Sequence, residues 1–239
     1  MNEKELKTSP KQRIFITLIA VIMLGSMLAS YAAIIVGNSS SASSDKISEA
    51  KKQEYENAYN EQLAKFKEAT KDDFNKFSKY RSEIKAYNET TVNNGSVESR
   101  DLVIGDGREL KEDSSDYLAY YVGWCADESI FDSSFDNNSS PTAFAKILDT
   151  SLGMIEGWYA GISGMRINGI REIAIPSSLA YGNSMEICGG YNKPLKFIVM
   201  TKENKDPLKT LAANLDTAYL KVQYAYQGID YDAAYTVSE

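Results

Sequence analysis

Histidine is absent from the 239-residue chain, and cysteine occurs only twice. The lack of histidine excludes a Ser-His-Asp or Cys-His nucleophile pair and a His-ligated zinc site. Two cysteines are also too few for a four-cysteine zinc site. Basic groups are scarce: 26 Lys and Arg stand against 33 Asp and Glu, and the net charge of −7 disfavours a nucleic-acid binder. We therefore expect no metal, no cofactor and no nucleic-acid partner.

Charge is missing altogether from residues 14–36, an apolar run that follows a basic tail at residues 1–13. About 20 apolar residues are enough to cross the ~30 Å hydrocarbon core of a bilayer as a helix. Because basic flanks stay on the cytoplasmic side, we expect a single-pass anchor in the cell membrane, with a cytoplasmic N-terminus and an extracytoplasmic C-terminal domain. A cleaved signal peptide, whose apolar region would be shorter, and a buried core helix are the alternatives.

The two cysteines are Cys125 and Cys188. An extracytoplasmic chain meets an oxidising compartment, where cysteines persist as disulfides. Because both cysteines fall in the same predicted domain, we expect a disulfide between them. The alternative is two buried free thiols.

Glycine and proline are absent from residues 45–92, which follow a flexible polar linker at residues 37–44. Lys, Glu and Ala dominate this segment and favour a helix. Aromatic and apolar residues recur at steps of three and four from Tyr55 to Tyr87, which predicts one long charged amphipathic helix. Its stripe could form a homodimer through residues 45–90, fold back on the C-terminal domain, or belong to a solvated spacer. The aromatic residues and Thr70 make it a poor leucine-zipper seam.

Residues 97–203 have a different residue pattern. Short apolar runs rich in β-branched and aromatic residues alternate with turn-forming residues. We predict strands at Tyr117–Trp124, Ile170–Pro176 and Leu195–Met200, and a short helix within Met154–Met165. The predicted fold class is therefore α+β, an antiparallel sheet wrapped around one short helix. Residues 204–239 add a C-terminal helix, expected to pack on the domain or on the long helix, and an acidic, tyrosine-rich tail.

Several short motifs in residues 100–203 stand in an order that resembles the FKBP-type peptidyl-prolyl isomerases of bacterial type. Each motif is weak alone, but five or six in sequence at the family's spacing are specific. They are Val122-Gly123, Phe131-Asp-Ser-Ser134, Met154-Ile-Glu-Gly-Trp158, Gly161-Ile-Ser-Gly-Met165, Arg171, Ile175-Pro176, Leu179-Ala-Tyr-Gly182 and Pro194-Leu195-x-Phe197. The resemblance implies an FKBP-like domain that isomerises X-Pro bonds of exported or surface polypeptides.

The resemblance also assigns roles within an apolar pocket. It implies that the Trp158 indole is the floor, that the Ile155 backbone N–H is a donor to a substrate carbonyl, and that the Tyr181 hydroxyl holds the bound peptide. The implied catalytic set is Tyr121, Phe131, Asp132, Ile155, Trp158, Tyr181 and Phe197, and the implied substrate-binding residues are Met154, Phe144 and Ile187. From the residue pattern alone, Trp158 could equally be plain core, Tyr181 a turn tyrosine, and Asp132 a cap of the following Ser-Ser turn.

The chain also departs from the family pattern. Asn137 stands where many relatives place an arginine that pairs with the acidic residue at Asp132, and Thr142 stands where an apolar wall residue is common. The loop at residues 183–191 carries Cys188-Gly-Gly190 in place of the usual Ile-Pro. These departures leave open a non-catalytic proline-peptide-binding or chaperone module on the same fold, and a structural stalk.

Overall fold

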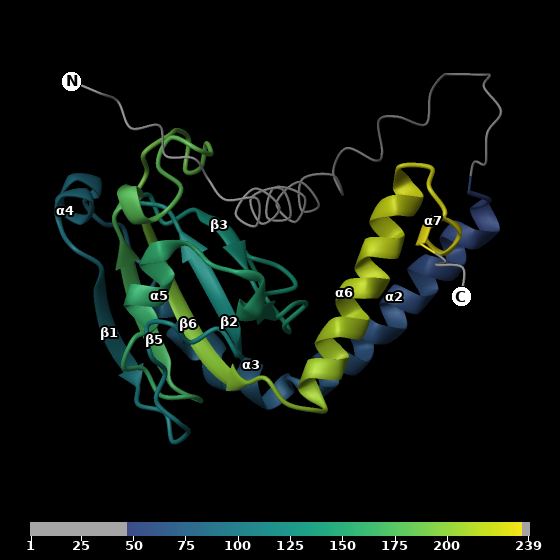
Figure 1. The fold of residues 1–239 in the computed structure, drawn as a ribbon, viewed down its shortest axis with the longest axis horizontal. Helices are drawn as coiled ribbons and strands as arrows, with labels where there is room; N and C mark the ends of the chain where they lie inside the picture. Colours follow the sequence, from purple (N-terminus) through teal and green to yellow (C-terminus); the bar gives the residue numbers. More distant parts are fainter. Residues whose placement is uncertain (1–46, 236–239) are drawn as a thin grey trace.

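The computed structural model describes residues 47–235 (Figure 1). The predicted basic tail, membrane anchor and linker all lie outside these residues. Within the described part of the chain, no helix combines the length and the apolar character needed to cross a membrane.

A six-stranded antiparallel sheet forms the body of the molecule. Its order is β1-β5-β6-β2-β3, and β4 pairs with β2. The strands are β1 (Glu98–Val103), β2 (Tyr117–Trp124), β3 (Ile130–Ser133), β4 (Leu148–Asp149), β5 (Ile170–Ile175) and β6 (Leu195–Glu203). Helix α5 (Glu156–Ile162) crosses one face, and the 3-10 turns η2 (Thr150–Leu152) and η3 (Ser177–Leu179) lie in the connections. The α+β prediction is confirmed.

Both faces of β2 are buried, because each is covered by a different part of the chain. Side chains alternate across a strand. Tyr117, Ala119 and Tyr121 face the cluster that contains α5. Leu118, Tyr120, Val122 and Trp124 face a second cluster, which contains Phe66 and Phe77 from the N-terminal helices. The sheet therefore has two cores, one on each face.

The N-terminal segment is not one long helix, so that prediction is wrong. It forms α2 (Glu49–Ala69), α3 (Lys71–Phe77), the 3-10 turn η1 (Ser78–Glu83) and α4 (Glu89–Asn94). The first break is at Thr70, a fully buried residue whose hydroxyl donates to the Phe66 carbonyl at 2.8 Å. A hydroxyl that bonds to the carbonyl four residues earlier bends a helix. The bend allows α3 and η1 to turn onto the sheet.

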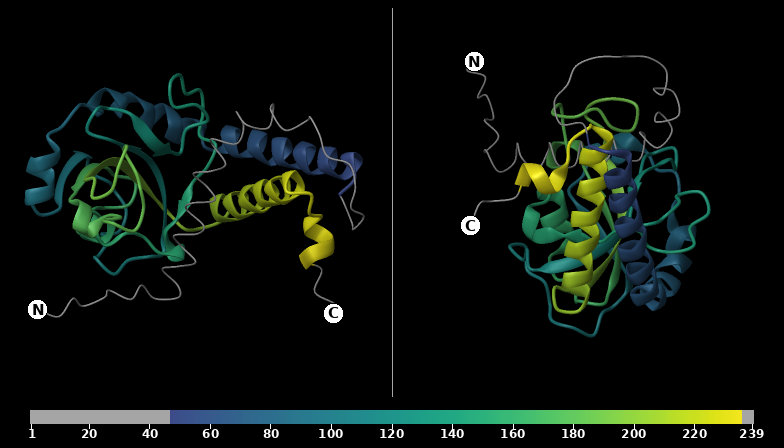
Figure 2. Two further views of the ribbon diagram at one scale, coloured as in Figure 1. Left: turned by 90° about the horizontal axis from the view of Figure 1, so that it is seen from above. Right: turned by 90° about the vertical axis from the view of Figure 1, so that its right-hand side faces the viewer.

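The predicted C-terminal helix is confirmed as α6 (Leu208–Tyr226), followed by the short α7 (Tyr231–Tyr235). Figure 2 shows α6 beside α2 in both views, and the two helices form an arm next to the sheet. The Tyr59 and Tyr219 rings lie 6.0 Å apart, and the Tyr55 hydroxyl donates to Asp230 at 2.6 Å. Helix α6 thus covers the first half of the apolar stripe, and the sheet covers the second half.

The stripe therefore folds back on its own chain. A homodimer through residues 45–90 would have to use other side chains. The boundary predicted between residues 92 and 97 also cuts through a shared core, because Phe66 and Phe77 are fully buried against sheet residues.

Candidate functional site

Helix α5 brings Trp158 directly onto the sheet because two glycines permit a close approach. A Cβ atom at Gly157 would lie 2.2 Å from a methyl carbon of Ile175, and one at Gly161 would lie 2.3 Å from a methyl carbon of Ile173. Any larger residue would push α5 away from β5. The glycines of the Met154–Met165 motif therefore fix the depth of the indole.

Four aromatic rings form the centre of the candidate site, and neighbouring rings meet edge to face. The Trp158 centroid lies 5.5 Å from that of Phe197 and 6.3 Å from that of Tyr121. Phe131 extends the group, with its centroid 5.5 Å from that of Phe197. Such geometry is the favourable one for aromatic pairs, so these rings hold one another in place.

Tyr117 is part of this site, although no motif or spacing indicated its role. Its hydroxyl accepts a hydrogen bond from the Trp158 indole N–H at 2.8 Å. Burial raises the pKa of Tyr117, so the hydroxyl stays protonated at neutral pH. The bond satisfies the only polar atom of the indole and leaves an apolar ring at the base of the site.

Asp132 lies at the edge of the site and has a partner that the sequence reasoning missed. Its carboxylate accepts hydrogen bonds from the Tyr121 hydroxyl and from the Lys146 ammonium. Burial, and then the nearby Asp132 carboxylate, raise the pKa of Tyr121. Lys146 thus supplies the cationic partner of Asp132 that Asn137 does not provide. No periodicity connects Lys146 to Asp132, so only the fold could reveal the pair.

The two departures at Asn137 and Thr142 have local structural roles. The Asn137 side chain accepts from the backbone N–H groups of Ser139 and Ser140. Thr142 is exposed and bonds to Asp136 through both its backbone and its hydroxyl. Neither side chain reaches the aromatic group.

Nearly all the predicted site residues come together on the α5 face of the sheet. Tyr121, Trp158, Ile187 and Phe197 are buried there, and Phe131, Met154, Ile155 and Tyr181 are half-buried around them. Phe144 is the exception, and its substrate-binding prediction is corrected. It is fully buried on the opposite face, where its ring stacks on Tyr120 at 4.0 Å. It stabilises the second core and does not line the site.

The indole itself is closed off, with only 1% of Trp158 exposed. Among the residues packed in its cluster, the half-buried ones are those that a ligand would meet first. Two polar groups at this rim have no hydrogen-bond partner among the described residues: the Ile155 backbone N–H and the Tyr181 hydroxyl. A polypeptide that displaced the rim side chains could therefore accept one hydrogen bond from the Ile155 N–H and one from the Tyr181 hydroxyl.

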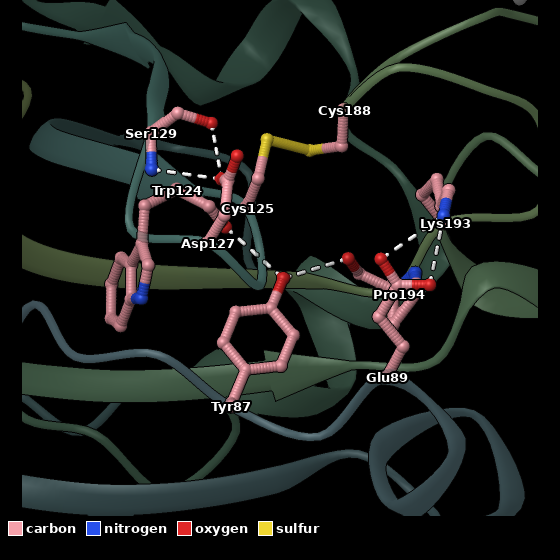
Figure 3. The surroundings of a disulfide bond; sticks show 9 residues. All are labelled: Tyr87, Glu89, Trp124, Cys125, Asp127, Ser129, Cys188, Lys193 and Pro194. Atoms are coloured by element: carbon pink, nitrogen blue, oxygen red, sulfur yellow. Dashed lines mark hydrogen bonds and ion pairs between the residues drawn. A yellow bond between two sulfur atoms is a disulfide. The ribbon is translucent and has the colours of Figure 1, made fainter.

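The predicted disulfide is present and joins Cys125, just after β2, to Cys188 in the loop before β6 (Figure 3). Ile187, next to Cys188, packs in the Trp158 cluster. The covalent bond therefore fixes the loop that covers the site to the end of a central strand.

Comparison with known proteins places this geometry in context. The family model described as FKBP-type peptidyl-prolyl cis-trans isomerase matches residues 109–202. An FK506-binding protein of Neisseria meningitidis serogroup A is 34% identical over 91 residues, which make up 37% of this chain and 76% of that protein. A probable FK506-binding protein of Corynebacterium glutamicum is 32% identical over 83 residues, or 34% of this chain and 64% of that one. The crystal structure of AtFKBP13 is 29% identical and aligns over 44% of this chain and 89% of that chain, with a TM-score of 0.33.

Proposed function

Because the chain belongs to the FKBP-type peptidyl-prolyl cis-trans isomerase family, we propose that its aromatic site catalyses X-Pro isomerisation by binding a twisted amide. The observation that supports it is a group of four aromatic rings, one of which is the Trp158 indole with its polar atom already hydrogen-bonded. The family shown by the comparisons is a family of rotamases. The substrate class and the binding mode are part of the proposal.

The chemistry needs no proton donor or nucleophile. Amide resonance creates a rotation barrier of about 18–20 kcal/mol. Rotation breaks that resonance and moves charge off the carbonyl oxygen, so a dry apolar site favours the twisted amide over the planar one. Each ~1.4 kcal/mol removed from the barrier speeds the reaction about tenfold. A chain without histidine can therefore perform this reaction.

The site residues have two roles, since some would bury the proline ring and others would orient the peptide. The proline ring would rest on Trp158, between Phe197 and Phe131, after the half-buried rim side chains move aside. The unpartnered Tyr181 hydroxyl and Ile155 N–H would orient the peptide by donating to its carbonyl groups. Burial, and then the charge of Asp132, raise the pKa of Tyr181, so its hydroxyl remains a donor at neutral pH.

We further propose that the clients are exported or surface polypeptides. The support is the uncharged run at residues 14–36 with basic groups before it, which indicates a membrane anchor with the domain outside. The Cys125–Cys188 bond fits the same oxidising compartment. Protease accessibility of the domain in intact cells would test this placement, and protection from added protease would contradict it.

An isomerisation assay on an X-Pro peptide tests the catalytic proposal. We expect Trp158→Leu and Tyr181→Phe each to lower kcat/KM by about tenfold or more, because each removes a group that contacts the substrate. Tyr191→Phe is the matched control, since Tyr191 lies in the same connection and is exposed. Wild-type rates in both site variants would show that the site lies elsewhere.

The second candidate is a non-catalytic module that binds proline peptides. The closed indole favours it over catalysis, because a peptide held only by the half-buried rim residues would not seat its proline ring on Trp158. Peptide binding by the wild-type chain without any rate enhancement would support this alternative.

A further inference from the structure

A segment outside the match to the family model holds the loop that covers the site. We call residues 84–95, which precede β1, the strap, and residues 177–194, which run from η3 to the start of β6, the pocket loop. The family model matches residues 109–202, so the strap lies beyond it. Tyr181 and Ile187 of the candidate site lie in the pocket loop.

One asparagine of the strap bridges the two ends of the pocket loop. The Asn93 side-chain oxygen accepts from the Ser177 backbone N–H at 2.8 Å, and its amide nitrogen donates to the Asn192 carbonyl at 3.2 Å. Ser177 begins η3, and the preceding Pro176 provides no side-chain cap for that turn. Asn93 therefore caps η3 from another segment, and the N–H that it accepts belongs to Ser177, four residues before Tyr181.

Two further strap residues bind the far end of the loop (Figure 3). The Glu89 carboxylate contacts the Lys193 ammonium with both oxygens, at 3.0 and 2.9 Å. The Tyr87 hydroxyl contacts the Pro194 carbonyl at 2.9 Å and the Trp124 carbonyl at 3.2 Å. Glu89 lies in α4, which Asn88 caps by accepting from the Thr91 N–H. The Glu89 contact thus comes from a capped helix, and Tyr87 lies just before its N-cap.

The middle of the loop is held by the disulfide. Cys188 has a positive φ of 55° and is bonded to Cys125, beyond the end of β2. The pocket loop is therefore fixed at both ends by the strap and at its centre by a covalent bond. A loop held at three points keeps its side chains in place without a ligand, and this lowers the ordering cost of binding.

We propose that the strap is a positioning and specificity-determining element of the isomerase site, and that Asn93 is its central residue. The inference rests on the proposed function, since Tyr181 and Ile187 act there on an X-Pro peptide. Asn93 does not touch the substrate. It fixes η3 against the start of β6, so that Tyr181 meets the peptide carbonyl and Ile187 meets the residue next to proline.

The test compares three variants of the full-length chain. Asn93→Ala removes both bonds, Asn93→Asp keeps the acceptor for Ser177 and loses the donor to Asn192, and Asn94→Ala is the matched control at an exposed neighbour. We measure kcat/KM for two X-Pro peptides that differ only in the residue before proline. Amide hydrogen exchange of residues 183–193 is followed in parallel, and thermal unfolding verifies that each variant is folded.

We expect Asn93→Ala to lower kcat/KM for the better peptide by about threefold to tenfold, to bring the two peptides closer together, and to speed exchange in the pocket loop. Asn93→Asp should fall between Asn93→Ala and wild type, and Asn94→Ala should match wild type. Should Asn93→Ala fail to fold, Asn93→Asp and Glu89→Gln carry the same comparison.

An active wild-type chain whose Asn93 variants keep its rate, its preference and its exchange pattern would overturn the role of the strap. An equal loss for both peptides, with the preference unchanged, would also overturn it, because that is the result of a merely structural residue. An inactive wild-type chain would instead overturn the proposed function, and hydrogen exchange would still report whether the strap holds the loop.

Discussion

Phe66→Ala tests the claim that α2 belongs to the same folded unit as the sheet. Phe66 has no exposed surface and packs in the core cluster with Phe77 of α3 and Leu118, Tyr120 and Val122 of β2. Truncation of a fully buried phenylalanine costs about 3–5 kcal/mol, because transfer free energy is lost and a cavity remains.

The expected change is large enough to measure by thermal unfolding. In a domain of 150–250 residues each kcal/mol shifts the melting temperature by about 2–4 °C, so Phe66→Ala should unfold about 6–20 °C below wild type. The transition should remain single, since one core connects the helices to the sheet. Circular dichroism at two wavelengths, one sensitive to helix and one to aromatic packing, would follow it.

The control is Lys65→Ala, on the exposed face of the same helix. Lys65 pairs with Glu61 one turn away, and such a surface pair contributes only about 0.3–0.5 kcal/mol. A melting temperature for Phe66→Ala close to that of Lys65→Ala would refute the shared core. So would two separate transitions, one for the arm and one for the sheet. Either result would favour the alternative in which the N-terminal helices are a stalk that folds independently of the sheet.

Replacement of both Cys125 and Cys188 by serine should lower the free energy of unfolding by up to about 4 kcal/mol. This is the loop-closure entropy that a disulfide with a sequence separation of 63 removes from the unfolded chain. Denaturant midpoints equal to those of the oxidised wild type would contradict this prediction. Lys146→Met should lower kcat/KM by about threefold to tenfold by loosening Asp132, and Lys146→Arg should restore most of it; equal rates in the two variants would count against the pair. Burial raises the pKa of Tyr121 above its usual 10.0. The stability that this shift contributes is therefore complete below pH 10 and is lost as the pH rises beyond that value. A melting temperature that stays constant through this range while tyrosinate absorbance rises would show that the fold does not hold this ring neutral.

The sequence predicted those parts of the fold that depend on local pattern. Strands at Tyr117–Trp124 and Leu195–Met200 were recognisable from β-branched and aromatic runs, and β2 and β6 lie there. The helix within Met154–Met165 is shorter than predicted, because Ile155 is the N-cap and Ser163 ends α5. The cysteine pair followed from compartment and count, which need no knowledge of the fold.

What the sequence could not predict depends on contacts between distant segments. The helical period from Tyr55 to Tyr87 continues through Thr70, and only the buried hydroxyl bond to the Phe66 carbonyl reveals the break. Phe144 lies in a short irregular stretch without alternation, so nothing local indicates which face of the sheet it joins. Family motifs indicated Trp158 but not the Tyr117 hydroxyl that receives its N–H, because that bond spans 41 residues.

The arm brings the start and the end of the described chain to one place. The Ile47 N–H contacts the Gly228 carbonyl at 3.5 Å, and α7 lies beside the start of α2 (Figure 1). With 21 residues in α2 at 1.5 Å per residue, the arm is about 30 Å long. The first and the last described residues therefore lie together at the far end of this arm, about 30 Å from the point where α2 meets the sheet. Whatever is joined to the described residues at 47 or 235 thus begins on the same side of the molecule, away from the sheet that carries the proposed site.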